Sequence, residues 1–243
     1  MNFWKNMPGD RLLADASIWS ANFTCLGDDI ARVDDFVDLY HFDVSDAHFI
    51  PGLLFFPDLI AALRPLTRKP FHIHLMSDNP LSLIDDFVQA GADMITIHCE
   101  NGPLAADPKT ADPKGLGRPL GSLCLQKIGE AGLSAGLALS LDSPPAKVLP
   151  YLEWIELVLL MGTPMGIKGQ ELSALACPRI QGMRLLLKEN GFEGKVKIEA
   201  DGGIRKHTVP ALRQSGADVV VMGSLCFKSD DPQQTFAWLH SLP

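Results

Sequence analysis

The chain has 243 residues, of which 47% are hydrophobic and 21% charged, and its formal net charge is -8 at pH 7. The acidic balance argues against nucleic acid as a partner, because a phosphate backbone is bound chiefly by clustered Lys and Arg. No segment approaches the roughly 20 consecutive apolar residues that a membrane span needs. The five cysteines include no C-x-x-C pair, so we expect neither a disulfide framework nor a cysteine zinc site, and we expect a cytoplasmic protein.

Short runs rich in apolar and β-branched residues recur along the chain and predict strands. They cover residues 14–20, 40–45, 71–76, 94–99, 134–140, 157–161, 196–200 and 219–222. Segments with helical spacing lie between them, at residues 26–39, 57–64, 81–90, 120–131, 177–190, 209–215 and 232–239. Strands that alternate with helices predict parallel βαβ units.

This number of βα units fits one closed (β/α)8 TIM barrel of the α/β class better than an open sheet. We therefore expect a single barrel domain over residues 1–243. Residues 101–117 are rich in Pro, Gly, Asp and Lys, and they predict an extended surface loop after the fourth strand.

Four ionisable residues fall where the strands of such a barrel end, and these ends form the usual place of an active site. His41 and Asp43 stand two apart in the second strand, so they share its inward face. His74 lies near the end of the third strand, and Asp201 ends the seventh. Two imidazoles and two carboxylates predict a site for one divalent ion such as Zn, Fe, Co or Mn.

Each of these four residues alone is more often a hydrogen-bonded group at a barrel end, and only their convergence favours the metal. The other histidines receive plainer interpretations. His72 is expected to be a hydrogen-bonded core residue one layer deeper, and His48 and His98 either support the ligands or are solvated. His207 and His240 are expected on the surface.

Glycines follow the last three predicted strands. The segments "DGGI" and "MGSLCF" end the seventh and eighth strands, where barrel enzymes often bind a phosphate through backbone N–H groups, and Ser224 adds a hydroxyl. The loop "GTPMGIKGQ" follows the sixth strand and brings Lys168. Lys168 is either a direct phosphate ligand or an ordinary solvated lysine, and the sequence leaves both open.

Several segments, taken in order, resemble the signatures of ribulose-phosphate 3-epimerases. They are "ASIWSANFTCLGDDI", "HFDVSDAHFIPGL", "HIHLM", "AGADMITIH", "GLALSLDSP", "IEADGGI" and "SGADVVVMGSLCF". The likeness runs from about Ala16 to Phe227, nearly the whole chain. It implies a (β/α)8 barrel that binds one divalent metal ion and interconverts D-ribulose 5-phosphate and D-xylulose 5-phosphate.

The resemblance also implies roles for individual residues. The metal ligands would be His41, Asp43, His74 and Asp201. Asp43 and Asp201 would also be the catalytic base and acid, exchanging roles with the direction of reaction through a metal-stabilised enediolate. The substrate-binding residues would be Ser17, His74, Met76, Gly166, Ile167, Lys168, Gly169, Gly202, Gly203, Gly223 and Ser224.

This chain departs from the family pattern around the ligand rather than at the metal. The departures include Ser45 for methionine, Ala47 for glycine, Gly52 for asparagine, Phe56 for glycine, His72 for aspartate, and Ile167 and Lys168 for phenylalanine and glycine. One alternative is therefore a related ketose-phosphate 3-epimerase with a shifted substrate such as allulose 6-phosphate. Another is a non-catalytic phosphosugar-binding barrel. The family often forms homo-oligomers, and the sequence does not choose a state for this chain.

Overall fold

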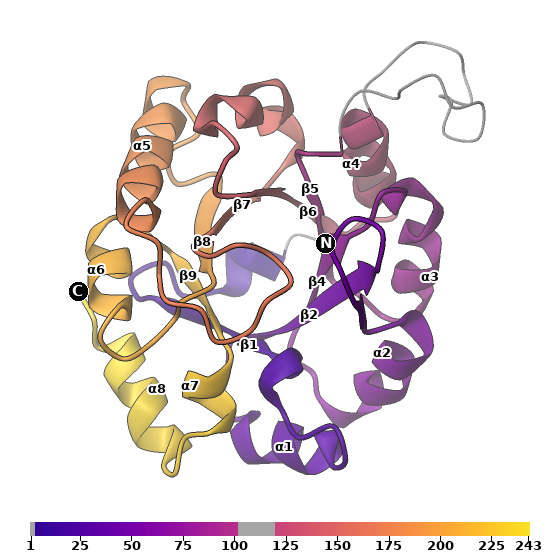
Figure 1. The fold of residues 1–243 in the computed structure, drawn as a ribbon, viewed down its shortest axis with the longest axis vertical. Coiled ribbons are helices and arrows are strands. Elements are labelled where there is room, and N and C mark those ends of the chain that lie inside the picture. Colours follow the sequence, from indigo (N-terminus) through magenta and orange to yellow (C-terminus); the bar gives the residue numbers. More distant parts are fainter. Residues whose placement is uncertain (1–2, 102–119) are drawn as a thin grey trace.

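The computed structural model describes residues 3–101 and 120–243, and its strands form a barrel with helices around it (Figure 1). The barrel strands are β1 Leu13–Ser17, β2 Leu39–Asp46, β4 Phe71–Met76, β5 Met94–His98, β6 Ser134–Leu139, β7 Leu157–Met161, β8 Lys197–Asp201 and β9 Val219–Met222. Neighbours run in the order β1-β9-β8-β7-β6-β5-β4-β2, and β2 pairs in parallel with β1 to close the ring. The predicted (β/α)8 TIM barrel is confirmed.

In the described chain an α-helix follows each barrel strand except β6, and the last two helices both follow β9. The α-helices are α1 Leu26–Val33, α2 Pro57–Leu63, α3 Ile84–Gln89, α4 Leu120–Glu130, α5 Ala176–Glu189, α6 Val209–Gln214, α7 Ser224–Phe227 and α8 Pro232–His240. Within the two described ranges, no helix has both the length and the apolar character that crossing a membrane requires. Apart from Asn101, the loop predicted at residues 101–117 lies outside the described residues.

Among the local differences from the predicted elements, one helix end was wrong and two short elements were missed. The first helix ends at Val33 rather than at residue 39, because the Asp38 N–H bonds the Ala14 carbonyl and so starts the sheet. The 3-10 helix η5 Pro145–Trp154 was not predicted, and its prolines explain its form, since Pro150 inside it lacks the N–H donor that an α-helix needs. The short strand β3 Leu53–Leu54 was also missed, and it pairs antiparallel with the end of β2.

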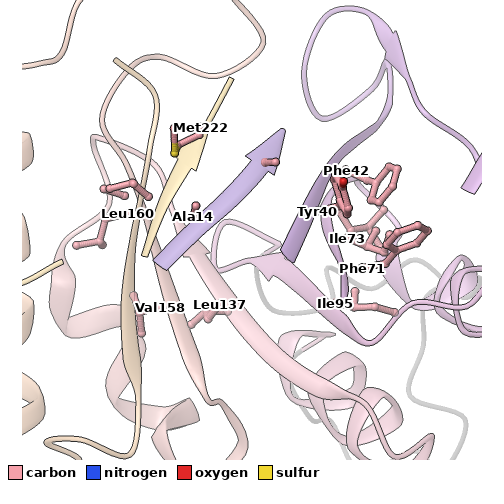
Figure 2. Close-up of a cluster of buried hydrophobic side chains, with 14 of the residues drawn as sticks. Ala14, Tyr40, Phe42, Phe71, Ile73, Ile95, Leu137, Val158, Leu160 and Met222 are labelled. Carbon is pink, nitrogen blue, oxygen red and sulfur yellow. The ribbon is translucent and has the colours of Figure 1, made fainter. Parts of the chain in front are cut away.

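The main core lies between the barrel strands and the helices. Alternate residues of each strand face outward, such as Tyr40 and Phe42 of β2 and Phe71 and Ile73 of β4, all fully buried (Figure 2). The rings of Phe42 and Phe71 lie 4.6 Å apart between centroids. Burying a side chain of this size contributes about 1.5–3 kcal/mol, so these neighbouring strands are held by their outer faces. Their inner faces are left free to carry polar groups.

The barrel interior changes character along its axis. At the floor, where the strands begin, Leu13, Leu39, Leu157 and Val219 form an apolar layer, and Trp4 of the 3-10 helix η1 Phe3–Asn6 packs against it. Toward the mouth, where the strands end, the inward residues become His, Asp and Glu. The apolar floor supports the barrel, and the polar chemistry gathers at the other end.

The loop after β2 contains a strained residue. Ala47 has φ of 61°, a left-handed conformation that costs an L-residue roughly 1–2 kcal/mol. The loop is held in place by the Asp46 carboxylate, whose Oδ1 accepts hydrogen bonds from the backbone N–H groups of His48 and Phe49 at 2.9 and 3.1 Å. Glycine, which the resemblance described above implies at position 47, adopts positive φ without this cost.

We expect Ala47→Gly to stabilise the fold by about 0.5–1 kcal/mol, because relief of the left-handed strain exceeds the added entropy of the unfolded chain. Chemical denaturation measures this change. The control is Ala211→Gly on the exposed face of α6, where glycine should instead cost roughly 1 kcal/mol. An equal loss of unfolding free energy in the two variants would contradict the strain at Ala47.

Candidate active site

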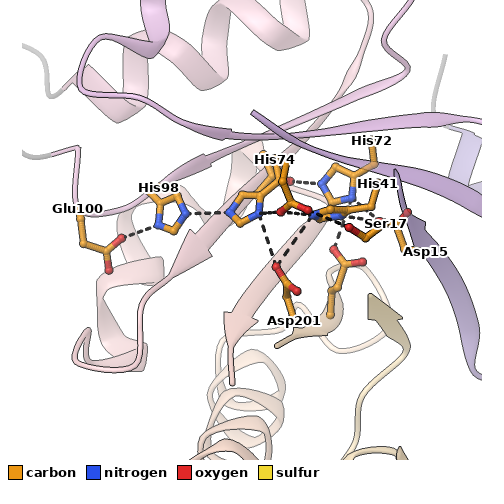
Figure 3. A network of polar contacts seen from close by, with 11 residues as sticks. Asp15, Ser17, His41, His72, His74, His98, Glu100 and Asp201 are labelled. Carbon is orange, nitrogen blue, oxygen red and sulfur yellow. Dashed lines mark hydrogen bonds and ion pairs between the residues drawn. The ribbon is translucent and has the colours of Figure 1, made fainter. Parts of the chain in front are cut away.

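Four side chains from three strands meet at the mouth of the barrel. His41 and Asp43 come from β2, His74 from β4 and Asp201 from the end of β8. Figure 3 shows His41, His74 and Asp201 of this group. The parallel register sets Asp43 beside His74, so both stand at the same height in the barrel. Each of the four offers one ligand atom, and these atoms all lie within 4.8 Å of one another. The structure thus brings together the four residues that the sequence predicted to converge.

The spacing of these atoms fits one metal ion. Asp43 Oδ1 lies 3.3 Å from His41 Nε2 and 3.4 Å from His74 Nδ1. Asp201 Oδ2 lies 3.6 Å from His74 Nδ1 and 4.0 Å from His41 Nε2. A tetrahedral ion with bonds of about 2.0–2.2 Å holds its ligand atoms roughly 3.3–3.6 Å apart. The group would need only small movements to bind such an ion.

The hydrogen bonding also fits a cation at this point. His41 Nε2 and His74 Nδ1 are buried, and neither has a hydrogen-bond partner within the described part of the chain. Leaving a buried polar atom unpaired costs about 1–3 kcal/mol. Two such nitrogens facing two carboxylates are the donor set that Zn and similar divalent ions prefer.

Behind His74 runs a line of polar side chains. His74 Nε2 lies 2.8 Å from His98 Nε2, and His98 Nδ1 lies 2.9 Å from Glu100 Oε2 (Figure 3). A carboxylate only accepts, so His98 donates from Nδ1 and accepts from His74 at Nε2. His74 therefore keeps its proton on Nε2 and turns the lone pair of Nδ1 toward the candidate metal position.

Glu100 is itself fixed from the next strand. Its Oε1 accepts hydrogen bonds from the backbone N–H and the hydroxyl of Ser140, at 2.9 and 2.7 Å, and from the Ser143 hydroxyl. Burial opposes its ionisation, but the hydrogen bonds from His98 and Ser143 outweigh burial and lower the pKa of Glu100. The sequence analysis did not single out Glu100. The two-residue spacing of His98 and Glu100 at a strand end was the available signal.

The two mouth carboxylates have opposite protonation tendencies. Burial alone would raise the pKa of Asp43, but the neighbouring imidazoles of His41 and His74 lower it well below the ordinary value. Burial and the charge of Asp43 raise the pKa of Asp201 to about 7. Near neutral pH, the pair therefore favours one ionised carboxylate and one protonated one. Such a pair can accept a proton at one oxygen and donate one at another.

A cavity of about 510 Å³ opens above these groups. All the residues predicted to bind substrate line it: Ser17, His74, Met76, Gly166, Ile167, Lys168, Gly169, Gly202, Gly203, Gly223 and Ser224. Asp43 and Asp201 also line it, whereas His41 lies beneath. The sequence analysis missed several further lining residues, among them Ser20, Thr163, Arg205 and Lys228. The Ser17 hydroxyl donates to Asp43 Oδ2 at 2.9 Å, which fixes the Asp43 carboxylate from β1.

Two glycines at the mouth are required by the backbone conformation and by the close packing of the loops. Gly203 has φ of 71°, and a Cβ added there would lie 2.6 Å from the Cα of Leu172. Gly202 also has positive φ, at 92°, and a Cβ there would clash with Thr163. The loops after β7 and β8 can therefore pack closely only with glycine at these positions. Both glycines line the cavity.

Lys168 is exposed and lines the cavity, so both sequence alternatives stay open, and it makes contacts that the sequence analysis did not foresee. Its ammonium group donates a hydrogen bond to the Trp19 carbonyl, and Nζ lies 4.7 Å from the centroid of the Trp19 ring. The side chain thus crosses from the loop after β7 to the 3-10 helix η2 Ile18–Ser20 after β1. Ser45, which stands where the family pattern has methionine, donates to the Gly52 carbonyl at 2.9 Å and is not among the cavity-lining residues.

The remaining histidines divide as follows. His72 is fully buried and hydrogen-bonded, as expected of a core residue. His98 is also fully buried and supports His74, whereas the side chain of His48 is 77% exposed. His207 lies on the surface as predicted. His240 does not, because its ring is half-buried with Nε2 3.3 Å from Asp38 Oδ2.

Comparison with known sequences gives consistent matches. Residues 13–227 match a family model described as the "Ribulose-phosphate 3 epimerase family". The ribulose-phosphate 3-epimerase of Bacillus subtilis (strain 168) is 32% identical over 222 residues, which cover 91% of this chain and 94% of that protein. The protein of the same name from Synechocystis sp. is 34% identical over 232 residues, which cover 93% of this chain and 92% of that protein.

Solved structures with the same architecture include more distant proteins. The 3-hexulose-6-phosphate synthase of Salmonella typhimurium superimposes with a TM-score of 0.64 at 19% identity and covers 94% of this chain and 96% of that one. The orotidine 5'-phosphate decarboxylase of Pyrococcus horikoshii OT3 superimposes with a TM-score of 0.61 at 13% identity and covers 93% of this chain and 97% of that one. At these identities the likeness concerns the fold alone.

We expect the affinity of the mouth site for Zn²⁺ or Co²⁺ to fall as pH decreases, with a midpoint above the ordinary histidine value of 6.5. Burial opposes the charged ring, but the carboxylates of Asp43 and Asp15 outweigh burial and raise the pKa of His41. A proton therefore competes with the ion for His41 at neutral pH, and raising the pH removes this competition. Titration against a chelating dye from pH 6 to 9 measures the effect.

The control for this titration is His207→Gln, which changes an exposed histidine and should leave the profile unaltered. His41→Gln should weaken binding and flatten the pH dependence between pH 7 and 9. An affinity that is constant over the whole range in the unaltered protein would contradict the prediction.

Proposed function

Because this chain belongs to the ribulose-phosphate 3-epimerase family, we propose that it is an isomerase that inverts C3 of a ketose phosphate, with D-ribulose 5-phosphate and D-xylulose 5-phosphate as its substrate pair. The observation that carries the proposal is geometric: two carboxylates, Asp43 and Asp201, meet two imidazoles at one site, with their ligand atoms within 4.8 Å of one another. The electrostatics of the two carboxylates agrees with it. The pKa of Asp43 is lowered and that of Asp201 is raised to about 7. Inversion of a carbon needs such a base and acid together.

A divalent ion such as Zn, Fe, Co or Mn, held by His41, Asp43, His74 and Asp201, would stabilise the negative charge that develops on the sugar oxygens. The residues of the chain would then move the protons. Asp43 takes the C3 proton on one face of the sugar, so a C–H bond breaks and an O–H bond forms. Asp201 gives its own proton to the opposite face and becomes a carboxylate. The reverse reaction exchanges the two roles.

The residues that line the cavity favour a phosphorylated ligand. Glycine-containing loops line the cavity, and Lys168, Arg205 and Lys228 bring positive charge to it. We infer that Ser224 and the N–H groups near Gly203 and Gly223 hold the phosphate. Met76 and Met161 form part of the wall near the carboxylates and would exclude water from the reacting carbon.

We further propose that the protein acts in the cytoplasm on a small phosphorylated substrate rather than on nucleic acid. All five cysteines are free, which is typical of a reducing compartment. The net charge of -8 disfavours a polyanionic partner such as DNA or RNA. The cations lining the cavity provide local donors for a single phosphate.

An activity screen of metal-loaded protein tests the substrate assignment. We expect the highest kcat/KM with ribulose 5-phosphate and xylulose 5-phosphate, compared with allulose 6-phosphate and fructose 6-phosphate. A preference for allulose 6-phosphate would keep the reaction type but replace the substrate pair. No turnover of any of the four, despite bound ion and bound phosphosugar, would favour a binding protein over an enzyme.

The roles of the carboxylates predict a sharper result. Asp201→Asn and Asp43→Asn should each lower epimerisation by about 10²–10⁴-fold, because one proton transfer is lost. In deuterated water, however, each variant keeps one working carboxylate. Each should still exchange the C3 hydrogen of one epimer without inverting it, and the two variants should act on opposite epimers. NMR of the recovered sugars measures this exchange.

Phosphate binding by the two variants, measured by calorimetry with inorganic phosphate, controls for a damaged cavity. If Asp201→Asn epimerises at the parent rate while it binds phosphate normally, the two-carboxylate assignment is wrong.

A further inference from the structure

A second layer of ionisable side chains lies beneath the mouth group. Asp15 of β1, His72 of β4 and Glu199 of β8 point into the barrel, and all three are completely buried. The proposed reaction uses none of them. His41 joins the two layers, because its Nδ1 lies 3.0 Å from Asp15 Oδ2 and its Nε2 lies 3.3 Å from Asp43 Oδ1.

The position of Asp15 decides which nitrogen of His41 carries the proton. Asp15 Oδ2 lies 3.0 Å from His41 Nδ1. A carboxylate can only accept, so Nδ1 must be the donor in this contact. In a neutral ring the lone pair then lies on Nε2, which points at the candidate metal position and has no other partner in the described chain. The opposite tautomer would set a lone pair against the carboxylate and an N–H against the ion.

Asp15 is held in place by a contact of its own. His72 Nδ1 lies 2.7 Å from the same oxygen, Asp15 Oδ2, and His72 Nε2 lies 2.7 Å from the Thr96 hydroxyl. One carboxylate oxygen thus accepts from two imidazoles that come from two different strands. This arrangement fixes the Asp15 carboxylate, and through it the His41 ring, without any contact with substrate.

The spacing in the lower layer fits hydrogen bonds better than a second metal ion. The two distances to Asp15 Oδ2, 2.7 and 3.0 Å, are hydrogen-bond lengths. Two ligand atoms of one tetrahedral ion would stand roughly 3.3–3.6 Å apart, which is the spacing that most of the mouth contacts show. The two layers have similar chemistry but different geometry.

From this geometry we propose that Asp15 is a positioning residue. It orients His41 from behind and holds its proton on Nδ1, so that Nε2 is presented to a divalent ion bound at the mouth. His72 and Thr96 keep Asp15 in place. The inference deepens the proposed function, since it rests on a metal ion at the mouth group.

Asp15→Asn tests the proposal, because the amide keeps the shape of the side chain but replaces a strong acceptor with a weaker one. The affinity for Zn²⁺ or Co²⁺, measured against a chelating dye, should fall about 10–100-fold, as is usual when the partner of a ligating histidine is lost. The stoichiometry should stay at one ion per chain. Binding of inorganic phosphate in the cavity should not change.

Asp38→Asn is the matched control. Asp38 is also a buried aspartate, but at the floor of the barrel, where it accepts hydrogen bonds from Arg11 and from the backbone N–H of Ala14. This variant should lose stability yet bind the ion as the parent protein does. A matching loss of affinity in Asp38→Asn would mean that the effect is general destabilisation, and the proposal would fail.

A second measurement uses the unaltered protein and so does not depend on the folding of any variant. Long-range ¹H–¹⁵N spectra of Zn-loaded protein labelled at histidine should show His41 with a proton on Nδ1 and none on Nε2. The reverse tautomer would overturn the proposal, as would two ions per chain with one in the lower layer.

The outcomes separate this inference from the proposed function. If the unaltered protein binds no divalent ion, both fail together. If it binds one ion and Asp15→Asn binds it equally well, only the positioning role of Asp15 fails.

Discussion

The structure depends on the burial of ionisable groups inside a closed barrel. Strands of a parallel barrel alternate between an outer face, which packs under helices, and an inner face, which meets the axis. In β2 this alternation buries Phe42 outside and His41 and Asp43 inside. A charge taken out of water is costly unless it is paired, so each inward imidazole must have an acid or another ring beside it. The polar contacts of the barrel follow from this requirement.

The contacts that offset the cost of burial also fix the orientation of the histidine rings. His74 is held through His98 by Glu100, and His41 is held directly by Asp15. In both cases a carboxylate lies behind the ring and the free nitrogen faces the mouth. The rings cannot turn or change tautomer without breaking a buried hydrogen bond, which costs about 1–3 kcal/mol. A site built in this way is ready to bind a cation before any ligand arrives.

Much of the fold and part of the site followed from local sequence pattern. Two residues spaced by two in a strand share a face whatever the rest of the chain does, so His41 and Asp43 could be placed together from the sequence alone. The partnership of Asp15 with His41 could not, because it depends on how β1 and β2 are aligned when the ring closes. The contact of Lys168 with Trp19 joins two loops far apart in the chain, and no periodic pattern encodes it. The end of the first helix was missed because pairing in the sheet overrode helical spacing at Asp38.

The packed floor of the barrel also determines by which end a ligand can enter and leave the cavity. Trp4 and the first residues of several strands fill that end with apolar side chains, so a charged sugar has no favourable passage through it. A ligand must therefore enter and leave at the opposite end of the barrel, where Lys168 and Trp19 are among the residues that line the cavity. A change that narrows the opening of the cavity would slow both substrate entry and product release. Residues at the rim of the barrel can therefore limit the rate of turnover although the reacting groups lie deeper.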